Sequence, residues 1–306
     1  MDLTQALRTA DPHASGLLPP IWRISCAGTF CMIVAGDIAV PFDGRTAGPG
    51  RLVLPDTDEN YGYADDLTVA CSSSQFCLAA GASKAASWNG RTWNPIKEPS
   101  GFNGYLACPA DRDCWAVAGG SAGTYSLDHL VGSTWSTATL PAGDGQAGVL
   151  DELVCTSTKA CYLWGNGGYL WTYDGSMWSS PRFMLVSDGQ SSEDFPNGIS
   201  CAAPDFCMAS GSSGGGILID NGSGFQPAPN LVPSEVFACG SPSFCLMSTV
   251  ADGGGSPAIF NGTKVIVDPA VADVEHGVNL ACTPARWCIS SQENSDTITI
   301  YNATST

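Results

Sequence analysis

The chain has 306 residues and a formal net charge of −17, with 29 acidic and only 12 basic residues. Nucleic acids and anionic membrane surfaces bind proteins through Lys and Arg side chains, so the negative net charge argues against both as partners. The sequence also holds 36 Gly and 20 Pro, which cost about 1 and about 3 kcal/mol respectively inside a helix. This composition favours short β-strands between turns. No run of 18 apolar residues is present, so no membrane insertion is expected.

A short phrase with two cysteines recurs along the whole chain and uses all 14 cysteines. The seven pairs are Cys26 with Cys31, Cys71 with Cys77, Cys108 with Cys114, Cys155 with Cys161, Cys201 with Cys207, Cys239 with Cys245, and Cys282 with Cys288. The first cysteines of successive pairs lie 45, 37, 47, 46, 38 and 43 residues apart. A period of about 40 to 45 residues is the length of one four-stranded propeller blade. The sequence therefore predicts an all-β chain, a seven-bladed β-propeller.

Each cysteine pair is expected to form a disulfide within its own blade, because fully paired cysteines are typical of oxidising compartments. One alternative is a metal site, but structural zinc needs four ligands and each pair offers two. The other is a cytosolic protein with reduced thiols. Residues 1–20 show no signal-peptide pattern. The predicted extracellular or cell-surface location therefore supposes that Met1 begins a mature domain or an excised fragment.

A second phrase follows the cysteines in most repeats and is best preserved as WNGRTW from Trp88 and YDGSMW from Tyr173. Asn-Gly and Asp-Gly predict type I′ hairpin turns, in which both central residues have positive φ. Each blade then consists of four antiparallel strands, A to D, with strand D carrying an aromatic residue. These aromatic residues are Trp93, Trp135, Trp178 and Phe225. We expect them to pack between neighbouring blades, and the alternative is that some form exposed platforms for sugars.

The last repeat ends at Thr306, just after its third strand. The spacing between strand D and the next cysteine in other repeats, counted back from Cys26, leads to the N-terminus. We therefore predict one domain, 1–306, whose seventh blade combines residues from about 278 to 306 with an N-terminal strand near 3–8. The alternative for that segment is a frayed end or a short helix.

The alternation of S/A-C-x5-C-x-A-x-G with W-D/N-G-x-x-W resembles the disulfide-bearing propeller repeats of secreted and cell-surface proteins of actinobacteria. It covers nearly the whole chain, but the sixth and seventh repeats lack the expected Gly after Cys245 and Cys288. The resemblance implies a seven-bladed propeller and an extracellular setting. It implies no activity, since one fold hosts many functions.

One acidic stretch suggests a metal site. Its oxygen-bearing side chains are Asp56, Asp58, Asn60 and Asp65. Their alternation is similar to that in calcium loops, but Tyr61 stands where a turn glycine is expected and no glutamate closes the loop. The alternative is a solvated acidic loop. No cofactor is required by the sequence, and calcium is the one that it suggests.

The connections from strand D to the next blade vary most in length and contain many of the acidic residues. Variable loops on a rigid scaffold are where binding usually resides. The ligand-binding residues predicted there are Tyr61, Tyr63, Asp66, Glu193, Asp194, Phe195 and His276.

These features favour a non-catalytic, monomeric extracellular module that binds a glycan or a protein, for example the sensor ectodomain of a membrane receptor or kinase. One alternative is a glycosidase or lyase whose acid pair comes from different blades, such as Asp194 with Asp65. Another is a structural surface repeat. Catalytic motifs are weak: the three histidines lie in different connections, and the G-x-S-x-G at 119–123 lies between strands rather than at a strand-to-helix turn.

Overall fold

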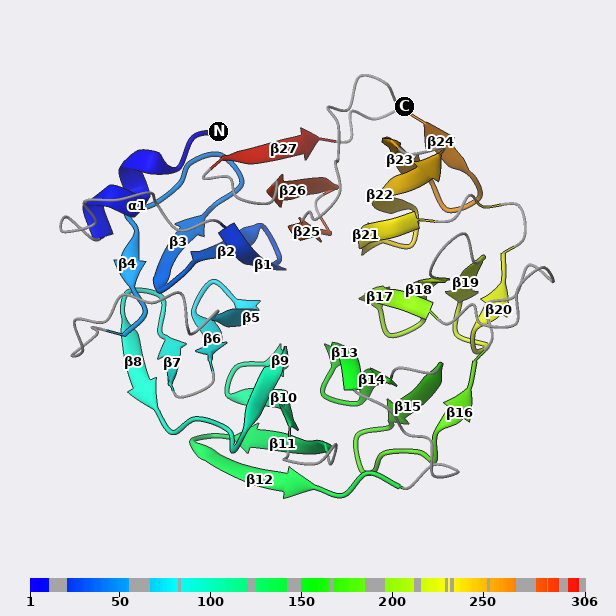
Figure 1. The fold of residues 1–306 in the computed structure, drawn as a ribbon, viewed down its shortest axis with the longest axis horizontal. Helices are drawn as coiled ribbons and strands as arrows, with labels where there is room; N and C mark the ends of the chain where they lie inside the picture. The colour runs from blue at the N-terminus through cyan, green and yellow to red at the C-terminus, as the bar shows by residue number, and fades with distance from the viewer. Residues whose placement is uncertain are drawn as a thin grey trace. The chain divides into compact units, whose positions relative to one another are not determined.

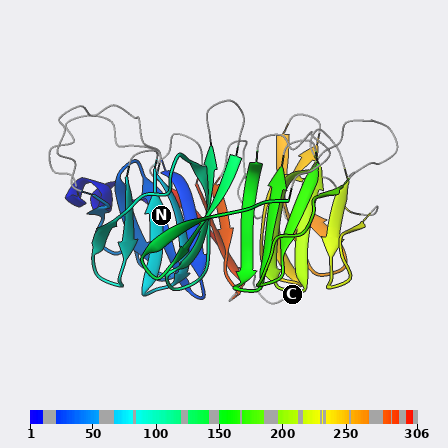
Figure 2. The same ribbon diagram turned by 90° about the horizontal axis from the view of Figure 1, so that it is seen from below.

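The computed structural model describes residues 1–10, 21–54, 67–81, 84–119, 125–141, 150–165, 168–184, 196–211, 216–228, 231, 234–251, 254–267, 279–284, 286–291 and 297–302. Within these ranges almost all regular structure is β, and its strands form seven antiparallel sheets (Figure 1). Each sheet is a meander of consecutive strands, and Figure 2 shows the same strands from a second side. The chain divides into two compact units, Met1–Thr139 with Ser291–Thr299, and Leu140–Ser290 with Ile300–Thr306.

The first unit contains helix α1 (Thr4–Ala10) and blades 1 to 3. Blade 1 consists of β1 (Ile21–Ala27), β2 (Phe30–Ala35), β3 (Ile38–Phe42) and β4 (Arg51–Leu52). Blade 2 consists of β5 (Thr68–Ser73), β6 (Phe76–Ala80), β7 (Ala85–Trp88) and β8 (Trp93–Ile96). Blade 3 consists of β9 (Phe102–Ala110), β10 (Asp113–Gly119), β11 (Tyr125–Val131) and β12 (Thr134–Ala138).

Blades 4 to 6 lie in the second unit, and blade 7 has residues in both units. Blade 4 consists of β13 (Leu150–Ser157), β14 (Ala160–Gly165), β15 (Tyr169–Tyr173) and β16 (Arg182–Phe183). Blade 5 consists of β17 (Pro196–Ala203), β18 (Phe206–Gly211), β19 (Ile217–Asp220) and β20 (Gln226–Pro227). Blade 6 consists of β21 (Ser234–Ser241), β22 (Phe244–Ala251), β23 (Gly254–Phe260) and β24 (Val265–Val267). Blade 7 consists of β25 (Asn279–Cys282), β26 (Trp287–Ser291) and β27 (Ile298–Asn302). The predicted seven-bladed propeller architecture is confirmed.

Every cysteine pair forms a disulfide inside its own blade, as predicted. The two sulfurs join the first two strands of a blade, and in the pairing of β5 with β6, for example, Cys71 stands directly opposite Cys77. The second cysteine of the pair is fully buried in most blades, for example Cys77 and Cys245. The repeated cysteine phrase is therefore a covalent clip across one hairpin.

The hairpin between the third and fourth strands is present, but the predicted type I′ turn is wrong. Among the described residues, positive φ outside glycine occurs only at Arg112 and Arg286, so Asn89 and Asp174 do not adopt it. Their side chains instead accept hydrogen bonds from backbone N–H groups further along the turn. This Asx arrangement leaves positive φ to the following glycine alone.

The N-terminal segment differs from the prediction, because the strand expected near 3–8 is helix α1. Leu3 and Leu7 are fully buried one helical turn apart. The Asp2 carboxylate accepts the N–H of Thr4 at 2.7 Å, and hydrogen bonding by the Thr4 side chain first, and then by this N–H, lowers the pKa of Asp2. Before the helix, one isolated bridge pairs Asp2 with Thr297 next to β27.

The aromatic residues of strand D are packed rather than displayed. Trp93 packs partly buried against a core cluster from blades 1 and 2, and Trp135 does so between blades 2 and 3. Phe225 is 9% exposed between blades 4 and 5, and Trp178 is 5% exposed. We use the word seam for the packed surface between two consecutive blades of one unit. The packing between blades predicted for these rings is confirmed for Trp93, Trp135 and Phe225, and Trp178 is buried.

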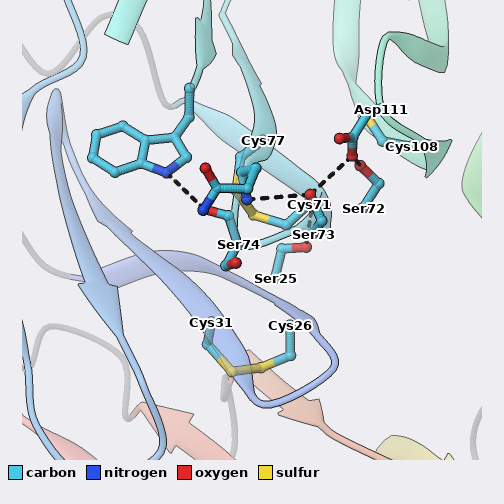
Figure 3. Close-up of a disulfide and its surroundings, with 12 residues drawn as sticks. Ser25, Cys26, Cys31, Cys71, Ser72, Ser73, Ser74, Cys77, Cys108 and Asp111 are labelled. Atoms are coloured by element: carbon cyan, nitrogen blue, oxygen red, sulfur yellow. Dashed lines mark hydrogen bonds between the residues drawn. A yellow bond between two sulfur atoms is a disulfide. The ribbon is translucent and has the colours of Figure 1, made fainter. Parts of the chain in front are cut away.

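Polar contacts also tie the clipped hairpins of adjacent blades together, as Figure 3 shows around the disulfide of blade 2. The Ser25 hydroxyl of blade 1 accepts the N–H of Cys71 at 2.9 Å. The hydroxyls of Ser72 and Ser73 donate to one oxygen of Asp111 in blade 3, at 2.6 and 2.9 Å. The clip of blade 2 is thus anchored to the blades on both sides. Among the described residues, no helix has the length and apolar character needed to cross a bilayer.

Candidate functional site

All residues predicted from the sequence to bind calcium or a ligand lie outside the described residues. These are Asp56, Asp58, Asn60, Tyr61, Tyr63, Asp65, Asp66, Glu193, Asp194, Phe195 and His276. The calcium site, the acidic binding face and the paired carboxylates of a glycosidase therefore stay predictions. Within the described part of the chain, no group of three or more His, Cys, Asp and Glu side chains could hold a metal ion.

The one described histidine has a structural environment in blade 3. The His129 ring stacks on Trp115 with centroids 3.8 Å apart and planes 2° apart, and its Nε2 lies 2.7 Å from Asp113 Oδ1. All three side chains come from paired strands β10 and β11. This arrangement fixes the imidazole within the sheet.

A groove of about 430 Å³ opens between blades 5 and 6 and is the candidate binding site. Blade 5 contributes the hairpin residue Asn221 and the outer strand β20, and blade 6 contributes its two turns through Pro242 and Gly262. The described residues that line it are Phe206, Ile219, Asn221, Gln226, Pro227, Ala228, Pro242, Phe260 and Gly262. Asn221 and Gln226 are exposed, so amide groups stand at the rim.

The floor of the groove is apolar and belongs to the core. The rings of Phe206 and Phe260 are 6% and 2% exposed, with centroids 6.3 Å apart and planes 17° apart. Ile219 and Ala228 pack against the same cluster. Rings packed in this way hold their positions without a ligand, so the groove is preformed.

Among the described lining residues none is charged, although the chain as a whole carries −17. Asp205 and Asp220 adjoin lining residues in sequence and also act on Tyr162 of blade 4. Burial first, and then the charges of Asp220 and Asp205, raise the pKa of Tyr162. Asp220 also accepts the N–H groups of Gly222 and Gly224, at 2.8 and 2.9 Å, which holds the hairpin that carries Asn221.

This seam has smaller side chains than the seam between blades 2 and 3. Between blades 2 and 3, Trp135 packs with Ile96 and its Nε1–H donates to the Lys97 carbonyl at 2.8 Å. Between blades 5 and 6, Val265 stands at the position of that tryptophan and Ala228 at that of the isoleucine. Ala228 lines the groove and Val265 does not.

Sequence reasoning missed this groove, because it looked for polar clusters in variable loops. When FNGTKV is aligned with WNGRTW, Val265 falls on the position of Trp93, but this replacement does not by itself locate the groove.

Comparison with known proteins supports the fold and does not identify a family. No family model matches the sequence, and no curated protein matches it. The structure is similar to YCF48 bound to D1 peptide, with a TM-score of 0.65 and 14% identity over 94% of this chain and 95% of that one. YCF48 from Cyanidioschyzon merolae gives 0.64 and 15% identity, over 94% and 96% of the two chains. The extracellular domain of the putative one component system BT4673 from B. thetaiotaomicron gives 0.64 and 11% identity, over 94% of this chain and 39% of that one. At such identities the likeness shows the fold alone.

Proposed function

We propose that the chain is an extracellular recognition module that binds a protein or glycan ligand as a monomer. The observation that carries this proposal is the preformed groove of about 430 Å³, whose described lining residues are uncharged, on a scaffold with one disulfide in each blade. Ligand sites are typically concave, mostly apolar and about 300 to 1,000 Å³ in volume, with a few polar groups that fix orientation. The apolar floor and the amide rim correspond to that description.

Two further observations support a binding role outside the cell. Disulfides form and persist in oxidising compartments, and all 14 cysteines of this chain are bonded. Among the structural neighbours, one is an extracellular domain of a putative one component system and another was solved with a peptide bound. A sensor ectodomain is the form of this function that we favour.

The test is binding of the oxidised chain to three defined sets of probes: a glycan array, purified cell-wall polysaccharides and a phage library of random twelve-residue peptides. We expect one class of ligand to be retained. The same chain after reduction and alkylation is the control and should lose it. Failure to bind in all three arms would overturn the proposal, and release of sugar fragments detected by mass spectrometry would replace it with a glycosidase or lyase.

A further inference from the structure

We propose that the ends of the third strands of blades 5, 6 and 7 are acceptor sites for N-linked glycans. The acceptor atoms are the side-chain Nδ2 atoms of Asn221, Asn261 and Asn302. This inference rests on the extracellular route of the proposed function and adds a covalent modification that binding does not require. The sugar in question is attached to the chain and is not a ligand.

The acceptor motif Asn-x-Ser/Thr occurs three times, always at the same place in the repeat. The copies are Asn221-Gly222-Ser223, Asn261-Gly262-Thr263 and Asn302-Ala303-Thr304. Each begins at the end of the third strand of its blade, β19, β23 or β27. The chain has twelve asparagines, and none of the other nine is followed by Ser or Thr at the second position. This motif is typical of surface turns that carry N-linked glycans in secreted proteins.

The turn after the third strand does not need this combination of residues. Blade 4 forms it with Asp174, which has no amide nitrogen, and in blade 2 Asn89 is followed at the second position by Arg91. In blade 5 the Asp220 carboxylate accepts the backbone N–H groups of the turn, so these bonds do not use the Asn221 side chain. The hydrogen bonding of the turn therefore does not explain the motif.

The hydrogen bonds of two of these asparagines use Oδ1 and leave the acceptor nitrogen unbonded. Asn221 Oδ1 accepts the Ser223 hydroxyl at 2.8 Å. Asn261 Oδ1 accepts the N–H and the hydroxyl of Thr263, at 3.2 and 3.0 Å. Neither Nδ2 donates a hydrogen bond to a described residue. A sugar bonded to Nδ2 therefore breaks none of the hydrogen bonds among the described residues.

The motif residues are also accessible. Residues 221–223 are all exposed, and Asn261 is half-buried with residues 262–263 exposed after it. Asn302 is exposed as well, while residues 303–304 lie outside the described residues. The described parts of the three motifs thus lie at the surface, as a bulky and hydrated modification requires.

The transfer needs a donor and an enzyme, namely an oligosaccharide on a lipid diphosphate and the transferase of the secretory route. The asparagine Nδ2 attacks C1 of the first sugar and forms an N–C bond. The C1–O bond to the diphosphate breaks, its electron pair leaves with the lipid diphosphate, and one amide proton passes to a base of the transferase. The product keeps its amide Oδ1, so the acceptor that Thr263 uses at Asn261 persists.

The first experiment maps the protein isolated from its natural source. Its peptides are treated with peptide-N-glycosidase in heavy-oxygen water, which converts each glycosylated asparagine to a labelled aspartate, and are analysed by mass spectrometry. We expect the label at Asn221, Asn261 and Asn302 and at no other asparagine. A sample without enzyme is the control, because Asn-Gly pairs also lose ammonia spontaneously. Detected peptides without the label at these three positions would overturn the inference.

The second experiment tests the motifs in the full chain secreted from a eukaryotic host cell. Ser223→Ala and Thr263→Ala should each remove one glycan from the intact mass, whereas Ser223→Thr keeps the motif and should keep the glycan. Arg91→Thr is the matched control, because it places the motif in the turn of blade 2, where Asn89 Nδ2 donates to Thr92 Oγ1 at 3.2 Å. A glycan at Asn89 of this variant, with the natural sites empty, would contradict the assignment. Empty motifs in every variant would contradict it equally.

The state of the cysteines separates this inference from the proposed function. A natural chain without glycans, with all 14 cysteines bonded and with binding to one of the probes, would overturn only the acceptor sites. A natural chain without glycans and with free thiols would contradict the extracellular route as well. Glycans at the three motifs of a chain that binds no probe would support the acceptor sites and leave the binding role overturned.

Discussion

In four blades a single side-chain oxygen organises the turn between the last two strands. The Oδ1 atoms of Asp43, Asn89, Asp174 and Asn261 each accept the N–H groups of the residues two and three positions further on, at 2.7 to 3.2 Å. Aspartate and asparagine alternate at this position. The acceptor oxygen therefore determines the turn. Where the residue is aspartate, the oxygen also carries a negative charge, and this makes the stability of the turn sensitive to pH.

Asp174 is the position where that sensitivity should be measurable. The N–H of Met177, the hydroxyl of Ser176 and the N–H of Ser176 stabilise its carboxylate and lower the pKa of Asp174 from 3.8 to about 2. A lowered folded-state pKa stabilises the protein fully above the ordinary pKa and ceases to do so as the pH falls through the folded value. The stability of the parent relative to Asp174→Asn should therefore decrease between about pH 4 and pH 2 in thermal melts.

The equivalent turn of blade 2 supplies the reciprocal control for this prediction. Asn89 makes the same bonds with an amide oxygen, so Asn89→Asp should gain the pH dependence that Asp174→Asn loses. If the melting temperatures of Asp174→Asn and the parent change equally between pH 4 and pH 2, the carboxylate contributes nothing to the stability of the folded state.

At the scale of elements, the first strands of neighbouring blades approach so closely that they restrict residue size. The Ser200 hydroxyl of β17 accepts the N–H of Cys239 in β21 at 2.9 Å. One residue further on, a Cβ at Gly240 would overlap the carbonyl oxygen of Thr283 next to β25. The corresponding residue of blade 5 is Ala202. The glycine is thus explained by close approach and not by its φ.

Because of this close approach, replacing the glycine by alanine should lower the free energy of unfolding instead of raising it. In an ordinary strand, Gly→Ala stabilises by about 0.5 to 1 kcal/mol. Gly240→Ala should instead destabilise by about 1 to 3 kcal/mol, the usual cost of overpacking. Urea unfolding measures the difference, with Ala202→Gly as a reciprocal variant that should cost no more than about 1 kcal/mol. A more stable Gly240→Ala protein would contradict the packing described for β21 and β25.

The N-terminal element shows where prediction from the repeat stops. A count of residues placed a strand near 3–8, because other repeats place strand D at that distance from a cysteine. The local sequence contains neither Gly nor Pro and repeats Leu at a spacing of four, at Leu3 and Leu7. Local helical preference and the burial of both leucines determined the element. Spacing taken from a repeat gives the position of an element but not its type.

The groove shows a different limit. Strands, clips and hairpins could be predicted because they need particular residues, namely two cysteines opposite each other and an Asx before a glycine. A groove such as the one lined by Phe206, Asn221 and Gly262 depends on how residues of two blades pack together, and no single residue type signals that. Polar motifs drew attention to loops such as 56–66, which lie outside the described residues.

For the whole molecule, the disulfides stabilise the blades one at a time. Each joins cysteines only five or six residues apart. Closing so short a loop is worth about 2 kcal/mol in the chain-entropy model. Packing between blades comes from the seams and their hydrogen bonds, and no disulfide joins one blade to another.

That division predicts the peptide map of the unreduced protein. Three clipped loops contain a tryptic site, at Arg112, Lys159 and Arg286, and four contain none. Digestion in denaturant without reductant should therefore leave four disulfides inside single peptides, with those of blades 5 and 6 together in peptide 183–264. Cys282–Cys288 should join two peptides. Cys108–Cys114 and Cys155–Cys161 together should join three, because peptide 113–159 contains both Cys114 and Cys155. Mass spectrometry before and after reduction measures both sets. Any other set of linked peptides, or a cysteine open to alkylation before reduction, would contradict a fold clipped blade by blade, because every sulfur here is bonded within its own hairpin.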